Sequence, residues 1–336
     1  MLTAHEARKL AIRRLAEVSQ GSDPSEERLG AIKAPRMLDL FARYLEQHAK
    51  PRKKPSSVES DERMWKHHLK GRLGAIQVRE VSRADVDALH YGLRAKPIIA
   101  NRVLALLSKM FNLSERWGWR DDGTNPCRHV ERYRERSRQR FLSEAELCRL
   151  GEALRQAELE GSEPPSAVAA LRFMIFTGCR RGEALNLSWS EVDFERGVVR
   201  LADSKTGPKV VILNAPALAL LGGLEQVGPW VFPGRQAGQP LSTGITRIWH
   251  RIRAKAELED VRLHDLRHSH ASAGVAAGVS IQVIGRLLGH TQAATTQRYA
   301  HLADDPARQA AERIGSYLKA AIDASDPADV VQLRGG

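Results

Sequence analysis

The sequence predicts a mainly α-helical protein with one small antiparallel β-sheet, and three observations lead to this fold class. Apolar residues recur at helical spacing along most of the chain, as on the buried face of an amphipathic helix. Short β-like runs separated by turn residues occur between residues 192 and 213. A stretch of alternating arginines at residues 131–140 contains almost nothing apolar, which is typical of an interdomain linker. The 336 residues, 42% of them hydrophobic, suffice for two buried cores.

The part before the linker is predicted to be helical. Residues 4–18 have the pattern of a short amphipathic helix, and residues 21–35 form a polar connector rich in Gly, Ser and Pro. Ser82 and Asp85 form a capping box that starts the third helix of a compact bundle. The four helices of this bundle are expected at residues 37–50, 56–69, 83 onward and 98–117.

The part after the linker is predicted to combine helices with the sheet. Ser143 and Glu146 form a capping box that opens a helix to about residue 159. Helices continue at residues 165–176 and 183–187, and the strands are expected at 192–194, 198–201 and 210–213. Further helices are expected at residues 244–256, 264–277, 281–288, 293–301 and 306–321.

The positive charge is concentrated in the first part of the chain. The net charge is +12, and residues 36–140 hold 24 Lys and Arg against 13 Asp and Glu, whereas residues 141–336 hold 22 of each. A positive field confined to one domain attracts a polyanion such as DNA. An anionic membrane, an acidic protein or a merely solubilising surface would account for the same charge.

Composition argues against several other classes of protein. No apolar run approaches the roughly 20 residues that a membrane span requires. The first predicted helix contains Glu6 and Glu17 and lacks the uncharged core of a signal peptide. Three scattered cysteines are too few for a disulfide framework or a four-ligand zinc site. A cytoplasmic protein without a membrane partner is expected.

Five segments of the second part are rich in groups that bind phosphate or move protons. They are T-G-C-R-R-G-E (177–183), S-K-T-G (204–207), H-D-L-R (264–267), L-G-H (288–290) and Q-R-Y-A-H (297–301). In this order they resemble the tyrosine recombinase family, which includes the phage and genomic-island integrases. That family has Arg in T-G-x-R-x-x-E, Lys in a β-hairpin turn, H-x-x-R, a His or Trp after L-G, and Tyr about nine residues later.

The resemblance implies a catalytic set for attack on a phosphodiester. Its members are Arg180, Lys205, His264, Arg267, His290 and Tyr299. Planar guanidinium groups can meet two phosphate oxygens at once, so Arg180 and Arg267 are the expected clamp. Glu183 lies one helical turn beyond Arg180 and can orient its guanidinium. Tyr299, the expected nucleophile, lies in a polar segment where a buried packing role is less natural.

No metal and no cofactor are expected. His264, His268 and His270 could be taken for a zinc site, but no H-E-x-x-H glutamate or cysteine pair accompanies them. His268 and His270 are interpreted as structural. The sequence contains no phosphate-binding glycine loop for nucleotide hydrolysis. A covalent protein–DNA ester stores the energy of the broken bond, so the strand can be rejoined without ATP.

The resemblance also implies the domain organisation. Residues 1–35 resemble the closing part of an arm-binding domain with its connector, and residues 36–130 a helical, SAM-like core-binding domain. Residues 131–141 would be the linker, 142–323 the catalytic domain and 324–336 a flexible tail. The residues expected to contact DNA are Arg132, Arg134, Arg136, Arg138, Lys53 and Lys54. In the family the helix after the tyrosine packs on a neighbouring protomer, and packing within the same chain stays open.

The function expected from the resemblance is site-specific DNA recombination through a covalent 3′-phosphotyrosyl intermediate, which integrates or excises a mobile element. The partners would be double-stranded attachment sites, a homotetramer on DNA and accessory DNA-bending proteins. A type IB topoisomerase would use similar chemistry as a monomer. A DNA-binding regulator that no longer cuts is a further alternative, and the complete catalytic set argues against it.

Overall fold

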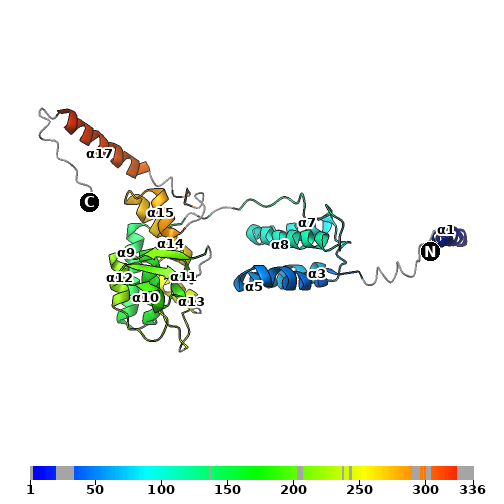
Figure 1. Ribbon diagram of the computed structural model, residues 1–336, viewed down its shortest axis with the longest axis horizontal. Helices are drawn as coiled ribbons and strands as arrows, with labels where there is room; N and C mark the ends of the chain where they lie inside the picture. The colour runs from blue at the N-terminus through cyan, green and yellow to red at the C-terminus, as the bar shows by residue number, and fades with distance from the viewer. Residues whose placement is uncertain are drawn as a thin grey trace. The chain divides into compact units, whose positions relative to one another are not determined.

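The computed structural model confirms the predicted mainly helical fold with one small sheet. It describes residues 3–19, 34–135, 138, 140–202, 207–236, 238–241, 244–289, 296–297, 299 and 304–323. The chain divides into two compact units, residues 1–137 and 138–336, each with its own hydrophobic core (Figure 1). Within the described ranges no helix is long and apolar enough to cross a membrane.

The first unit contains the exposed helix α1 (Ala4–Ser19) and a helical bundle (Figure 1). Two arms of the bundle each pass through a π-helical turn: α3 (Met37–Tyr44), η1 (Leu45–Ala49) and α4 (Lys50–Arg52), then α5 (Pro55–Met64), η2 (Trp65–Leu69) and α6 (Lys70–Leu73). The helix α7 (Arg83–Gly92) starts at the predicted capping box of Ser82 and Asp85. The long helix α8 (Pro97–Arg116) packs against both α3 and α7.

The bundle core is aromatic and contains one ion pair. Phe41 and Trp65 stack with their ring centroids 4.4 Å apart. Tyr44 is completely buried, and its hydroxyl donates to an oxygen of Asp61 at 2.6 Å. Lys53 donates to the same carboxylate at 2.6 Å and to the Tyr44 hydroxyl at 2.7 Å. Burial and the neighbouring Asp61 raise the pKa of Tyr44, so its phenol stays neutral within this network.

The second unit contains a three-stranded sheet that lies among its helices (Figure 1). Its strands are β1 (Val192–Asp193), β2 (Val198–Leu201) and β3 (Lys209–Ile212), antiparallel in the order β1-β2-β3. Val199 pairs with Val211 and Leu201 with Lys209. Its helices are α9 (Glu144–Leu159), α10 (Pro165–Thr177), α11 (Arg181–Leu185), α12 (Ala215–Gly222), α13 (Ile245–Lys255), α14 (Leu263–Ala276), α15 (Ile281–Leu288) and α17 (Asp304–Asp323), with the 3₁₀ turn η3 (Trp189–Glu191).

One helix of this unit was not predicted. The helix α12 begins at Asn214, whose side chain accepts a hydrogen bond from the backbone N–H of Ala217 at 3.1 Å. Its sequence is almost uniformly Ala and Leu, so it has no polar face and gives no amphipathic pattern. The predicted helix at 293–301 lies largely outside the described residues, as do the predicted connector and the C-terminal tail.

Candidate active site

A glycine turn at the end of α10 presents Arg180. The helix ends at Thr177, and Gly178 adopts a left-handed conformation with φ +63°. A Cβ at Gly178 would lie 2.8 Å from side-chain atoms of His270 and Leu288, so both the turn and the close packing require glycine. Arg180 follows in extended conformation, immediately before α11, and its side chain is 20% exposed.

The carboxylate of Glu183 is shared between two cations. One oxygen accepts from Nη1 of Arg180 at 2.7 Å, and the other accepts from the backbone N–H of Arg180 at 3.0 Å. The second oxygen also accepts from Nζ of Lys209 at 3.0 Å, and the Lys209 side chain is only 6% exposed. Burial opposes ionisation of Glu183, but Lys209 and Arg180 outweigh it and lower the pKa of this carboxyl.

Arg267 lies where the ends of two helices meet. It is 4% exposed, and its two terminal nitrogens donate to the carbonyls of Gly178 and Leu288, each at 2.7 Å. Leu288 ends α15, which is closed by Gly289 in a left-handed conformation with φ +67°. Carbonyls at a helix end lack partners within the helix and carry the negative end of its dipole. They therefore fix the guanidinium of Arg267 and stabilise its charge.

These groups leave an excess of positive charge in one place. Burial and the proximity of Arg180 lower the pKa of Arg267, whereas Glu183 opposes that shift. Arg180, Lys209 and Arg267 thus supply three positive charges against the single carboxylate of Glu183. We call these four residues the arginine cluster. An anion with several oxygens would balance its charge and accept hydrogen bonds from both guanidinium groups.

Tyr299 lies beside the arginine cluster and is buried. The ring is 4% exposed and packs among residues of α14 and α15, including Val275 and Leu288. The phenol is near enough to Arg267 to influence its pKa. The expectation that Tyr299 would have no buried packing role was wrong, because its ring contributes to the small apolar cluster that these two helices share.

His268 forms a hydrogen bond between its Nδ1 and the hydroxyl of Tyr299. His264, one turn earlier on α14, is exposed, and its ring meets that of His268 edge-on with 5.0 Å between centroids. The partly buried ring of His270 is hydrogen-bonded through Nδ1 to the carbonyl of Ile175 at 3.1 Å, and desolvation lowers the pKa of His270. Among the described residues no group of three or more His, Cys, Asp or Glu side chains could hold a metal ion.

Two members of the predicted catalytic set, Lys205 and His290, lie outside the described residues. Their described neighbours can be placed. Lys209, four positions after Lys205, begins β3 and belongs to the arginine cluster through its contact with Glu183. Gly289, which precedes His290, packs tightly on the Lys209 side chain. A Cβ at Gly289 would lie 2.7 Å from Cε of Lys209. The described residues Lys209 and Gly289 are thus in contact at the arginine cluster.

The basic residues predicted to contact DNA have different surroundings. Arg132 and Arg134 are exposed, as is Lys54 at the start of α5. Lys53 is instead bound to Asp61 and Tyr44 inside the first unit. Arg136 lies outside the described residues.

Each end of the predicted linker is fastened to its own unit. In the first unit the side-chain amide of Asn101 donates to the Tyr133 carbonyl and to Glu135, both at 2.8 Å. In the second unit Arg138 donates to Asp260, and Arg140 does so at 2.8 Å. Because Arg138 and Arg140 pair with carboxylates, their charges are partly compensated within the protein.

Two residues of the site were not recognised in the sequence. Lys209 shares the inward face of β3 with buried Val211, and the alternation of side chains along a strand could have identified it as a buried lysine. His268 was interpreted as structural, although it lies one helical turn after His264 and next to Arg267. Its contact with the Tyr299 hydroxyl depends on how α14 and α15 pack, which the sequence pattern does not specify.

Comparison with known proteins finds a matching family and several relatives. Residues 140–305 match the model of the phage integrase family. The integrase of Salmonella phage P22 is 32% identical over 174 residues, which cover 47% of this chain and 44% of the phage protein. The shufflon-specific DNA recombinase of Escherichia coli is 31% identical over 62% of this chain and 52% of its own length. The chain therefore spans about half the length of the curated relatives it matches.

A solved structure shows the same fold. The lambda integrase dimer bound to a COC′ core site superimposes with a TM-score of 0.67 at 21% identity, over 88% of this chain and 86% of that one. The family match includes Arg180, Arg267 and Tyr299, which the fold brings together around two helix ends. By the family match and these relatives, the chain belongs to the phage integrase family, the tyrosine recombinases.

Proposed function

We propose that the protein is a site-specific DNA recombinase that cleaves and rejoins duplex DNA through a 3′-phosphotyrosyl intermediate. One observation carries this proposal. The arginine cluster, with three positive charges and one carboxylate, lies beside the buried phenol of Tyr299. A phosphodiester gathers negative charge on its non-bridging oxygens during attack, and preorganised cations stabilise that charge. The relatives named integrase and recombinase support the same activity.

In the proposed reaction the Tyr299 oxygen forms a bond to phosphorus while the bond from phosphorus to the 5′-oxygen breaks. The phenolic proton leaves by way of His268, which is hydrogen-bonded to the Tyr299 hydroxyl, and of the neighbouring His264. Lys205 protonates the departing 5′-oxygen. Arg180 and Arg267 hold the non-bridging oxygens, and His290 donates a hydrogen bond to the same phosphate. Rejoining reverses these steps with a 5′-hydroxyl from another strand, so the number of phosphodiester bonds is conserved.

Two carbonyls already occupy two of the five N–H donors of Arg267. The remaining donors are the ones that can meet a phosphate, so its approach to this guanidinium is restricted. Arg180 is more exposed, and its charge is shared with Glu183. We infer that Arg267 fixes the position of the phosphate, and that Arg180 turns from Glu183 toward the phosphate when DNA binds.

The proposed partners are double-stranded attachment sites and three further copies of the chain. Strand exchange between two duplexes requires four active sites, and lambda integrase has been solved as a tetramer bound to a Holliday junction. We include accessory DNA-bending proteins among the proposed partners of this assembly. We place the reaction in the cytoplasm, where the three free cysteines would remain reduced.

A nicked suicide duplex tests the covalent chemistry. Its sequence would be selected from random duplexes by the full-length protein, and the nick lets the cleaved end diffuse away before religation. The wild-type protein should form an adduct that withstands denaturing electrophoresis, and Tyr299→Phe should form none. Binding without an adduct in the wild type would identify a regulator. Relaxation of a supercoiled plasmid that lacks the selected site would favour a topoisomerase.

A further inference from the structure

A second basic hollow lies next to the arginine cluster, in the same unit. It has a volume of about 520 Å³ and lies between α11, α13 and the start of α14. Its polar lining consists of Arg181, Thr246, His250, Arg253, Arg262 and His264. No Asp or Glu is among the described residues that line it. Three guanidinium groups without a carboxylate form a site for an anion.

The hollow adjoins the arginine cluster without including it. Arg181 directly follows Arg180, and His264 lies three positions before Arg267 on α14. Neither Arg180 nor Arg267 lines the hollow. The start of α11 therefore presents Arg180 to the arginine cluster and Arg181 to the hollow. The helix α14 likewise carries Arg267 of the cluster and His264 of the hollow.

Arg253 forms a fixed part of the hollow. One terminal nitrogen donates to the Val261 carbonyl at 2.7 Å, and the other lies 3.0 Å from Nδ1 of His250. Arg181 and Arg262 are exposed, and their guanidinium groups form no hydrogen bond or ion pair with the parts of the chain that the structure describes. The hollow thus combines one preorganised guanidinium with two that remain available to an incoming anion.

We propose that this hollow binds the phosphate adjacent to the scissile phosphate on the cleaved DNA strand. The inference rests on the proposed function, because it takes the arginine cluster as the scissile-phosphate site. A DNA strand presents one charge for about every 3.4 Å of helix axis, so a strand held at Arg180 must bring its next phosphate to a nearby surface. Arg181 and Arg262 bind that phosphate and set the register of the strand over Tyr299.

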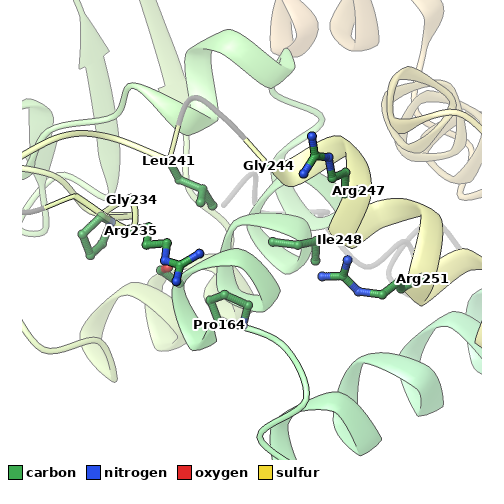
Figure 2. A pocket seen from close by; sticks show the side chains of 10 residues that line it. Pro164, Gly234, Arg235, Leu241, Gly244, Arg247, Ile248 and Arg251 are labelled. Atoms are coloured by element: carbon green, nitrogen blue, oxygen red, sulfur yellow. The ribbon is translucent and has the colours of Figure 1, made fainter.

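The helix α13 also provides a matched control. Figure 2 shows Arg247 and Arg251 beside Pro164 and Leu241, lining a different pocket. Neither Arg247 nor Arg251 lines the hollow, to which α13 contributes His250 and Arg253. Arg251 pairs with the buried carboxylate of Glu163 at 2.6 Å, whereas Arg247 is exposed. Arg247→Gln removes one exposed positive charge, as Arg181→Gln and Arg262→Gln do, from a residue that does not line the hollow.

The test combines charge removal on the protein with charge removal on the DNA. Suicide duplexes would carry one neutral methylphosphonate, either next to the scissile phosphate or several positions away. Equilibrium binding and adduct formation would be measured for the full-length wild type and for Arg181→Gln, Arg262→Gln and Arg247→Gln. Each hollow variant should bind the unmodified duplex about tenfold more weakly, the effect of one charge-assisted hydrogen bond.

The outcome that supports the proposal is coupling between the two changes. The loss caused by Arg181→Gln or Arg262→Gln should disappear when the phosphate next to the scissile one is neutral, and should persist when a distant phosphate is neutral. Arg247→Gln should show no such dependence. If each hollow variant lost the same affinity on every duplex, the proposed phosphate subsite would be rejected. Adduct formation would be unaffected by that result. Coupling in binding without any adduct would instead reject the recombinase chemistry and retain the phosphate site.

Discussion

The two units use their positive charge in different ways. The first is strongly basic, yet its Lys53 is bound to Asp61 and Tyr44. The second has equal numbers of basic and acidic residues from position 141 onward, yet it gathers three cations around Glu183. The net charge of a domain governs attraction at a distance, whereas chemistry depends on a local imbalance among a few buried groups.

The largest effect of a charge-conserving substitution is expected at Arg267. An ammonium group is a point charge and cannot reach two helix-end carbonyls and a phosphate together. Arg267→Lys should therefore slow cleavage of the suicide duplex by about 10²- to 10³-fold in single-turnover assays. Arg286→Lys, an exposed position on α15, is the control and should cleave at the wild-type rate. A loss below threefold at Arg267 would show that its geometry is unimportant.

Removing the charge of Lys209 should destabilise the protein more than removing that of Lys53. Lys209 is 6% exposed, and its loss leaves the buried Glu183 with Arg180 alone. Lys209→Met should lower the free energy of unfolding by about 3 kcal/mol. The Lys53 side chain is 32% exposed, so Lys53→Met should cost about 1 kcal/mol. Denaturant titration of the full chain measures both.

A double variant separates charge from packing at Lys209. If the cost of Lys209→Met arises from the uncompensated carboxylate, adding Glu183→Gln should restore part of the stability. Strictly additive losses would indicate that the lysine stem, packed on Gly289, matters more than its ammonium group.

The first unit offers a matched pair of lysines for testing long-range attraction. Lys54 is exposed, whereas its neighbour Lys53 is held by Asp61. If Lys54 meets a phosphate, Lys54→Gln should reduce the slope of log affinity against log salt for duplex DNA by about 0.9. Lys53→Gln should change that slope less. Equal changes for both variants would mean that the ion pair with Asp61 opens on DNA.

The smallest effect concerns acid stability of the second unit. Burial lowers the pKa of His270, so the unfolded chain takes up a proton on this residue before the folded chain does. Neutral His270 therefore makes its full contribution to the free energy of unfolding above about pH 6.5, the pKa of histidine in the unfolded chain. That contribution is lost as the pH falls below this value. The protection factors of amides in α10 and α14, which are corrected for the pH dependence of intrinsic exchange, should fall between pH 7 and pH 5.5, and should fall less in His270→Gln. Identical pH profiles would contradict this assignment.

Local patterns predicted most of the fold but not the contacts of the site. Capping boxes at Ser82 and Ser143 correctly located two helix starts, whereas α12 lacks the polar face that would reveal a helix. The motifs indicated which arginines to examine. The sharing of Glu183 with Lys209 and the burial of Tyr299 depend on how β3, α14 and α15 pack, and residue spacing alone does not determine that packing.

The most direct test of the central claim is to locate the DNA on the protein. The suicide adduct would be digested and the nucleotide-bearing peptide identified by mass spectrometry. The chain has five tyrosines, and Tyr317 on α17 is far more exposed than Tyr299. We predict that the 3′-phosphate is found on Tyr299 although its ring is buried. Attachment to Tyr317 or to any other side chain would contradict the account.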